Sequence, residues 1–337
     1  MTQRVLTPDL IANEALMVLD NNLVMANKVF RGYENEFDQK VNGYKPGQTI
    51  SIRRPTDFTV RSGATIDVQE VNEGKTTITV NRQRGVDFNF SSVDLTLKIE
   101  ELSERVIRPA MVQLANEVDA DLMSLYADVP NWTGTPGQTI NSFADFGKGP
   151  ERLDEFAVPV DMRSATLSPA DHWGLLGNQT GLYIEKEARD AYRKASLGMI
   201  GGVDTYMTQN TPTHTCGSRS GSILIDGSIT TSTISYDDVK DTMTQTIHID
   251  ALGGATQTVK AGDVFTIVDV YAVNPVTKTA LPFLKQFTVT ADATAASSET
   301  DLTISPPIIW TGAQQNVSVT SSVTDLDGQA ATFVGAA

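Results

Sequence analysis

Two potential metal ligands, His214 and Cys216, lie two residues apart in the sequence HTC. A structural zinc site usually takes four ligands, and the other histidines of the chain are His172 and His248. No local pattern supplies the missing ligands. We therefore interpret His214 and Cys216 as ordinary loop residues, and predict neither a metal site nor a cofactor.

A second charged group is the sequence SYDDVKD, which places Asp237, Asp238 and Asp241 around Lys240. Clustered carboxylates can bind a divalent cation, but the glycine and distal glutamate of an EF-hand loop are missing. A solvated loop is the simplest interpretation. The sharper alternative is a loop that makes salt bridges to a neighbouring subunit, since such pairs set register while contributing little energy.

Two arginine pairs, Arg53 with Arg54 and Arg82 with Arg84, lie on stretches that we predict to be antiparallel strands of one ribbon. A basic ribbon could contact phosphate groups. No aromatic residues interleave for base stacking, however, and acidic residues dilute the charge. These are Asp57, Asp67, Glu70, Glu73 and Asp87. A ribbon of mixed charge that another protein surface covers accounts for the pattern better.

Catalytic signatures are missing from the sequence. There is no Walker A loop, nucleotide-binding glycine fingerprint, nucleophile elbow or zinc-protease helix. Serine, histidine and aspartate are all present, but no local signature selects a triad from them. We predict that the protein is not an enzyme. A hydrolase remains a rival that would explain the scattered polar residues.

The overall composition fits a globular protein with more than one compact unit, because 337 residues exceed the usual size of a single domain. The chain has 26 Lys and Arg against 41 Asp and Glu, a net charge of −15. This balance argues against a broad duplex-binding face. One cysteine is consistent with a reducing compartment. We see no secretory signal and no apolar run long enough to span a membrane.

The first half of the chain is expected to hold two long helices separated by strands. Thr7 as N-cap and Pro8 at the first helical position predict a helix that runs to about Phe30. Period-two alternation between Asn42 and Phe90 predicts strands with little core of their own. A second helical region begins at Ser91 or Ser92, and Pro109 predicts a kink or a helix start close to Ile107. Its apolar stripe is Ile107, Met111, Leu114, Val118, Leu122 and Leu125.

The second half changes from mixed to all-β character. Residues 131–150 are predicted to be a loop, followed by a short helix over 151–156. Strands are expected at SATLSP and GGVDTYMTQN, and helices at ADHWGLLG and YIEKEARDAYRK, which suits an α+β domain. Past Thr211, short strands alternate with turns, as in a small barrel or sandwich. A domain boundary is expected near 211–221.

Taken in order, these segments resemble a known family. A helical arm is followed by KPGQTISIRRP, ERVIRPAMVQLANEVDADLMSLY, ATLSPADHWGLL and MIGGVDTYMTQNTPTHT. They are similar to the major capsid (coat) proteins of tailed bacteriophages, of the podovirus type with an inserted β-barrel domain. The resemblance implies an α+β capsid fold of the HK-ninety-seven type.

The resemblance also implies a division of the chain and a set of partners. The inter-subunit contact candidates would be the two arginine pairs and the SYDDVKD loop. Copies would form hexameric and pentameric capsomers with a scaffolding protein and a portal, enclose DNA without sequence-specific binding, and contact no membrane. The shell would be part of the virion, assembled in the host cytoplasm. The implied segments are an N-terminal helical arm (1–34), an extended β-hairpin loop (35–90), the spine helix and peripheral domain (91–150), axial-domain elements (151–211) and an all-β insertion domain (212–337).

One departure from the family concerns the end of the chain. Relatives with the insertion return afterwards to finish the axial domain, whereas this chain stops at GQAATFVGAA. We therefore expect an incomplete axial domain. The alternative function is a β-rich cell-surface or tail-associated binding module, which would explain the second half but not the arm and the ribbon.

Overall fold

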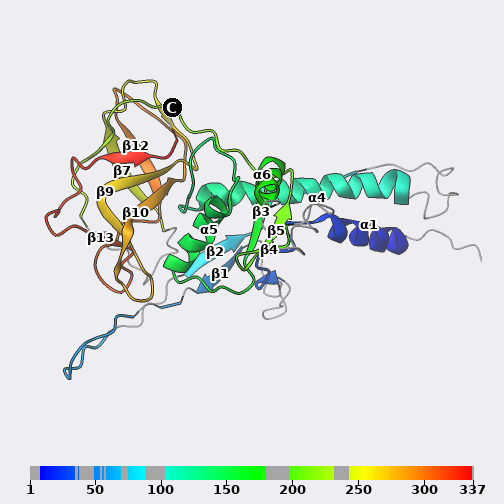
Figure 1. The fold of residues 1–337 in the computed structure, drawn as a ribbon, viewed down its shortest axis with the longest axis horizontal. Helices are drawn as coiled ribbons and strands as arrows, with labels where there is room; N and C mark the ends of the chain where they lie inside the picture. Colours follow the sequence, from blue (N-terminus) through cyan, green and yellow to red (C-terminus); the bar gives the residue numbers. More distant parts are fainter. Residues whose placement is uncertain are drawn as a thin grey trace, which may run out of the picture.

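The structure is a computed structural model that describes residues 8–34, 37, 49–53, 55–56, 58–69, 75–87, 103–179, 197–230 and 243–335. The subunit is elongated (Figure 1): a β-rich unit occupies one end, and two helices project side by side at the other. Within these residues no helix combines the length and the apolar character that a membrane span requires.

The N-terminal helix, α1, runs from Pro8–Asn22 and packs along the long helix α4. It ends earlier than predicted. The amide of Asn22 donates to the carbonyl of Val18 at 2.6 Å, and the chain then turns because the next backbone N–H groups find a partner on α4. A long-range contact, rather than local periodicity, therefore ends this helix.

The long helical region consists of three consecutive pieces. One π-helical turn, η2 (Ser103–Ile107), precedes α4 (Arg108–Met123), and a 3-10 turn, η3 (Ser124–Asp128), follows. Pro109 lies in the first turn of α4, where a missing backbone N–H costs nothing. The predicted helix start near Ile107 is confirmed, whereas the predicted cap at Ser91 or Ser92 lies outside the described residues.

The buried side of α4 differs from the predicted stripe by one residue. Ala115, Asp119 and Met123 are buried at intervals of four, on the side that faces the N-terminal segment. The predicted stripe residues Met111, Leu114, Val118 and Leu122 are half-buried, and Leu125 is exposed. The subunit alone thus covers only part of the apolar surface of this helix.

A two-stranded ribbon forms from β1 (Thr49–Arg53) and β2 (Lys75–Thr79), which pair antiparallel from end to end. The prediction of antiparallel strands is confirmed for this part. Arg82 and Arg84 lie beyond the end of β2 in the extended chain, so their placement on a strand was wrong. They leave the ribbon because each finds a carboxylate on α4.

Helix α5 (Phe143–Glu155) overlaps the segment predicted as a loop. The prediction over 131–150 was wrong from Phe143 onward, because Gly147, Gly149 and Pro150 were interpreted as loop residues. Ser142 caps the helix by accepting the backbone N–H of Asp145 at 3.1 Å, and Phe146 is buried in the core beside it. Capping and burial outweigh the poor helix propensity of the glycines.

A small three-stranded sheet has the order β3-β5-β4, with β3 and β5 parallel. The predicted strands at SATLSP and GGVDTYMTQN and the predicted helix at ADHWGLLG are confirmed. The segment YIEKEARDAYRK lies outside the described residues. The elements are β3 (Ser164–Leu167), α6 (Pro169–Gln179), β4 (Met199–Ile200) and β5 (Val203–Met207).

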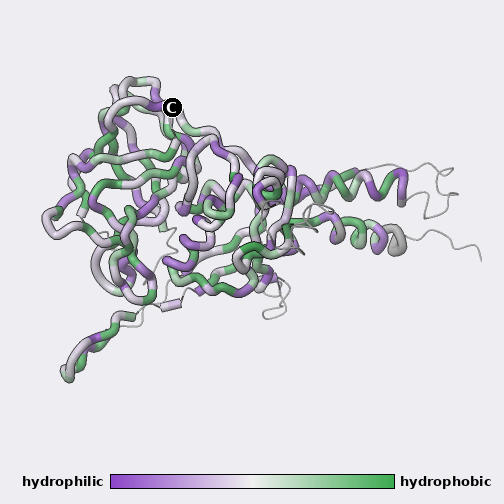
Figure 2. The backbone as a smooth tube through the Cα atoms, in the orientation of Figure 1, coloured by the Kyte–Doolittle hydropathy of each residue, from purple (hydrophilic) through white to green (hydrophobic). Residues whose placement is uncertain are grey.

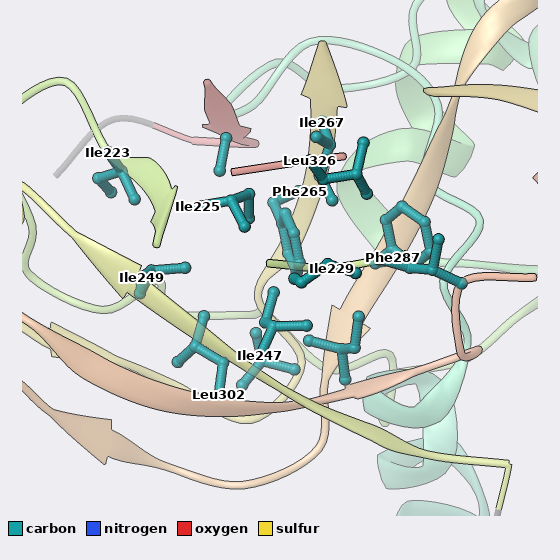
Figure 3. Packing of buried hydrophobic residues seen from close by; sticks show 14 of the residues in the cluster. Ile223, Ile225, Ile229, Ile247, Ile249, Phe265, Ile267, Phe287, Leu302 and Leu326 are labelled. Carbon is teal, nitrogen blue, oxygen red and sulfur yellow. The ribbon is translucent and has the colours of Figure 1, made fainter. Parts of the chain in front are cut away.

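The remaining strands form what we call the β unit, β6 to β14. Its seven-stranded sheet has the order β13-β9-β10-β12-β7-β6, with β14 also paired to β9, and β8 and β11 form a separate pair. Apolar side chains from these strands point inward to one core (Figure 3) around Phe265 and Phe287. The strands are β6 (Leu224–Asp226), β7 (Gln245–Asp250), β8 (Thr258–Val259), β9 (Val264–Val273), β10 (Ala280–Val289), β11 (Ala293–Thr294), β12 (Thr300–Ser305), β13 (Val317–Val319) and β14 (Ala331–Phe333).

Candidate assembly interface

The tip of the ribbon, residues 58–69, projects away from the rest of the subunit (Figure 1). Phe58, Val60, Ile66 and Val68 are each more than half exposed there, and Figure 2 shows hydrophobic stretches along this projection. Burial of such side chains yields about 25 cal/mol per Å² of apolar surface. The tip therefore gains most of its stability only when another surface covers it.

Two reciprocal hydrogen bonds hold the tip in shape. The backbone N–H of Thr59 donates to the side-chain oxygen of Gln69 at 2.8 Å, and the side-chain amide of Gln69 donates to the Thr59 carbonyl at 2.6 Å. Gly63 takes a φ of 105°, which favours glycine at this turn. The tip is thus an ordered turn whose apolar side chains are exposed.

Positive charge gathers where β1 ends and β2 begins, the end of the strand pair from which the tip projects; we call this end the ribbon base. Arg53 ends β1 and lies directly opposite Lys75, the first residue of β2. Like charges in register destabilise a strand pair, so this position favours nearby carboxylates. Arg54 follows immediately in the sequence but lies outside the described residues.

Arg82 and Arg84 bind carboxylates of the same subunit. Arg84 makes a two-pronged contact with Asp121 of α4 at 2.8 and 2.9 Å, and Arg82 donates to the same carboxylate at 3.1 Å. Glu117 lies 3.3 Å from Arg84. The Arg84 guanidinium lowers the pKa of Asp121 from its usual value. These contacts attach the extended segment that follows β2 to α4, and a contact of either arginine with a neighbouring subunit stays a prediction.

The SYDDVKD residues Asp237, Asp238, Lys240 and Asp241 lie outside the described residues. Their contact with a neighbouring subunit also stays a prediction.

A groove of about 450 Å³ runs along α5 and ends at the β4–β5 turn. Its lining combines apolar residues, Phe143, Phe146 and Pro150, with carboxylates, among them Glu151 and Asp154. Asp154 is paired with Arg163 at 2.8 Å. A lining of apolar and acidic side chains suits a partner segment that combines apolar and basic side chains.

The buried carboxylate of Asp119 joins the N-terminal segment to α4. It accepts the backbone N–H of Val24 at 2.8 Å and that of Ala26 at 3.1 Å. At the other end of the long helical region, the Ser103 hydroxyl of η2 donates to Glu14 of α1 at 2.8 Å. Sequence reasoning missed Asp119, although one signal was available: an acidic residue in line with buried Ala115 and Met123.

A second buried carboxylate, Asp263, lies directly before β9 in the β unit. One oxygen accepts Arg219 at 2.6 Å and the backbone N–H groups of Gly217 and Lys260; the other lies 2.9 Å from His214 Nε2. The sequence around it, VKAGDVFTI, by itself indicates only a turn before a strand. We call these contacts the Asp263 node.

The Asp263 node extends to the long helical region through Tyr126 of η3. The Tyr126 hydroxyl lies 2.9 Å from His214 Nδ1, so with His214 donating to Asp263 the phenol donates to the imidazole. Burial raises the pKa of Tyr126, with Asp263 adding to the effect, so the phenol keeps its proton. His214 lies in a loop, as predicted, and its hydrogen bonds to Tyr126 and Asp263, which the sequence did not predict, make it a bridging residue. Cys216 lies close enough to His214 and Asp263 for a shared ion, although the Asp263 node is already closed by hydrogen bonds.

Strand β10 makes two more contacts with the helical part. Gln286 exchanges two hydrogen bonds with the backbone of Trp132, at 2.8 and 2.9 Å, and the Thr288 hydroxyl donates to the Ala127 carbonyl at 2.8 Å. Nearer the start of β10, Phe283 packs edge-on against Phe156. These contacts fix the β unit against η3 and the end of α5.

Lys285 of β10 lowers the stability of the subunit, because its charged ammonium group is buried where β10 packs against the end of α5. Burial, with Arg152 nearby, lowers its pKa from 10.5 to about 8, while its ammonium lies 5.1 Å from the centre of the Phe156 ring. At neutral pH both folded and unfolded states carry the charge, and the folded state bears the cost of burying it. We expect Lys285→Met to raise the free energy of unfolding at neutral pH by about 1–2 kcal/mol.

The stability difference between Lys285→Met and the wild type should depend on pH. Between about 8 and 10.5 the unfolded chain binds more protons at Lys285 than the folded chain, so the wild type gains stability as pH rises and the advantage of the variant shrinks. Urea unfolding of the wild type and the variant, at neutral and at alkaline pH, measures the free energies of unfolding. A variant no more stable than wild type at neutral pH would contradict the prediction.

Comparison with solved structures gives a limited likeness to several chains. The chain is similar to a structure from Mycobacterium phage Che8, with 13% identity over 93% of this chain and 88% of that one and a TM-score of 0.44. It is also similar to the mature capsid of bacteriophage PhiM1, with 15% identity over 76% of this chain and 81% of that one and a TM-score of 0.36. The CUS-3 coat protein I-domain matches 34% of this chain and 96% of its own, with 22% identity and a TM-score of 0.24. No curated protein matches the chain.

An α+β subunit with an exposed apolar ribbon tip is compatible with a shell-forming structural protein of the tailed-phage capsid class. The family described as "P22 coat protein - gene protein 5" matches residues 4–333, so the chain belongs to the P22 coat protein family. It is therefore a major capsid protein of a bacteriophage, a structural component of the virion and not an enzyme. Copies of it assemble with one another into an icosahedral capsid. This result favours the predicted structural role over a cell-surface or tail-associated binding module.

Proposed function

We propose that the subunit forms hexameric and pentameric capsomers in which the ribbon of one copy lies on its neighbour. The observation that carries this proposal is the ribbon tip, where Phe58, Val60, Ile66 and Val68 are exposed on a hairpin with no core of its own. Closed shells need interfaces of this kind, because extended segments bury their apolar area only on assembly. The basic ribbon base and the acidic groove along α5 add complementary charge.

The shell encloses double-stranded DNA without sequence-specific binding. A net charge of −15 supports this part of the proposal, because a strongly acidic subunit does not condense on nucleic acid by itself. DNA then enters through a portal, and a scaffolding protein guides closure in the host cytoplasm.

The β unit serves as the insertion domain over residues 212–337. Its own core, and its attachment to the rest of the subunit through side chains such as Gln286 and Thr288, support a unit that folds around its own sheet and then docks. The SYDDVKD sequence contacts a neighbouring capsomer through its carboxylates. The arm (1–34), hairpin loop (35–90), peripheral domain (91–150) and axial elements (151–211) complete the subunit.

Reversing the charge of the ribbon base tests the proposal. We expect the double variant Arg53→Glu/Arg54→Glu to give a folded subunit that fails to assemble or forms aberrant shells, because the basic base would then repel an acidic partner. Negative-stain electron microscopy measures the shells, and circular dichroism checks the fold. The matched control, Arg105→Glu/Arg108→Glu, makes the same change of net charge on exposed residues away from the ribbon. Normal shells from the ribbon variant would rule out the proposed contact.

A separate charge reversal tests the loop between capsomers. Replacement of Asp237, Asp238 and Asp241 by lysine should leave the circular dichroism spectrum unchanged and disturb the closure of shells, since salt bridges between subunits set register. Open or irregular particles in electron micrographs are the expected result. Particles with wild-type closure would show that this loop makes no essential contact.

A further inference from the structure

Four side chains that the assembly function does not use meet on the outer face of the β unit. His248 lies on β7, directly opposite Asp226 of β6 on one side and Asp301 of β12 on the other. Glu299 precedes β12 on the same side of the sheet. The neighbours of His248 along β7, Ile247 and Ile249, point into the core (Figure 3), so the imidazole lies on the opposite face.

The orientation of the imidazole is set by one short hydrogen bond. His248 Nδ1 lies 2.7 Å from a carboxylate oxygen of Asp301. In the neutral ring this bond places the proton on Nδ1 and leaves the lone pair of Nε2 on the other side. A carboxylate behind the imidazole is the arrangement that orients histidine ligands in metal sites.

The spacing around Nε2 distinguishes this group from an ordinary hydrogen-bonded cluster. Nε2 lies 3.5 Å from a carboxylate oxygen of Asp226 and 3.8 Å from one of Glu299, and the three donor atoms lie within 4.8 Å of one another. Good hydrogen bonds are shorter than this. With metal–ligand distances of about 2.0–2.2 Å, donors around a tetrahedral zinc ion lie about 3.4 Å apart. The spacing therefore suits an ion pair when the ring is protonated and a shared metal ion when it is neutral.

The Asp263 node provides a useful contrast. His214 and Asp263 are 2.9 Å apart there, and the second carboxylate oxygen already accepts Arg219 at 2.6 Å. Those donors are in direct contact with one another, and a guanidinium lies against the carboxylate. Of the two groups of potential ligands among the described residues, only the one at His248 leaves space between its donor atoms.

We propose that Asp226, His248 and Glu299 bind a divalent transition-metal ion of the Zn²⁺ class, with Asp301 as the positioning residue of the imidazole. Water completes the coordination, because the site is open to solvent. Imidazole and carboxylate are both ligands that zinc accepts. The ion joins β6 and β7 to the segment that begins β12, and so stabilises the β unit independently of assembly.

The test is a titration of untagged, full-length subunits with ZnCl₂ by isothermal calorimetry. We expect one saturable site per subunit, with weaker binding at acidic pH because protons compete for the imidazole. The variant His248→Gln should lose binding by at least about tenfold, and Asp301→Asn by about tenfold, the range usual for residues that orient a ligand. Absorption spectra with Co²⁺ in place of Zn²⁺ report the coordination directly.

Two further variants complete the design. Asp292→Asn removes an exposed carboxylate of the same β unit that pairs with Lys260, and it should bind Zn²⁺ as the wild type does. Glu299→Gln removes a ligand with little change of shape, and it should also weaken binding if His248→Gln does not fold. A titration without saturation in the wild type would overturn the proposal, and so would unchanged affinity in the folded His248→Gln or Glu299→Gln variants.

Discussion

We expect replacement of Asp263 by asparagine to lower the free energy of unfolding of the β unit by about 3–5 kcal/mol, the usual cost of breaking a buried ion pair. The carboxylate is fully buried and accepts Arg219, His214 and two backbone N–H groups. Asparagine keeps the shape but leaves the Arg219 guanidinium, itself buried, without its counter-ion. The side-chain NH₂ of the asparagine would also face one of the N–H donors that the carboxylate now accepts.

Urea unfolding of the full-length subunit, followed by circular dichroism, measures this effect. The matched control is Asp292→Asn, in which the lost carboxylate is exposed and pairs with Lys260 at the surface. That variant should unfold at nearly the wild-type midpoint, because surface ion pairs contribute little. Equal midpoints for the two variants would show that the Asp263 node does not hold the β unit together.

The second large effect concerns Asp119. We expect Asp119→Ala to cost about 2–4 kcal/mol, because two backbone N–H groups lose a charged acceptor in a buried position and a small cavity is left behind. The turn that follows α1 should then detach from α4. Hydrogen exchange of residues 23–29 measures this locally and should become markedly faster than in the wild type.

Glu117→Ala is the control for this experiment, since Glu117 lies on the same helix two residues earlier and its side chain is exposed beside Arg84. Its exchange rates over residues 23–29 should match those of the wild type. The role assigned to Asp119 would be contradicted if Asp119→Ala left those rates unchanged in a folded subunit.

Local signals in the sequence predicted many of the elements correctly. Pro109 predicted where α4 begins, since a proline is compatible only with the first turn of a helix. Alternation predicted the antiparallel pairing of β1 with β2, and turn residues predicted the all-β character of β6 to β14. The resemblance to phage capsid proteins came from the order of these elements, and the family match confirms it.

What the sequence could not predict depends on contacts between distant residues. Arg82 and Arg84 leave the ribbon because Asp121 lies on a helix nearly forty residues away in the chain. Helix α1 ends early because Asp119 takes the next backbone N–H groups. Glycines and a proline hid α5, whose cap and buried Phe146 outweigh propensity. His214 and Asp263 are forty-nine residues apart, so no spacing rule joins them.

The most direct test of the proposed assembly is negative-stain electron microscopy of the purified wild-type subunit, alone and with its candidate scaffolding protein. Uniform closed particles or hexameric rings are the expected result, because the exposed apolar ribbon tip and the half-covered face of α4 should be buried by neighbouring copies. A subunit that stays monomeric under both conditions would contradict the account.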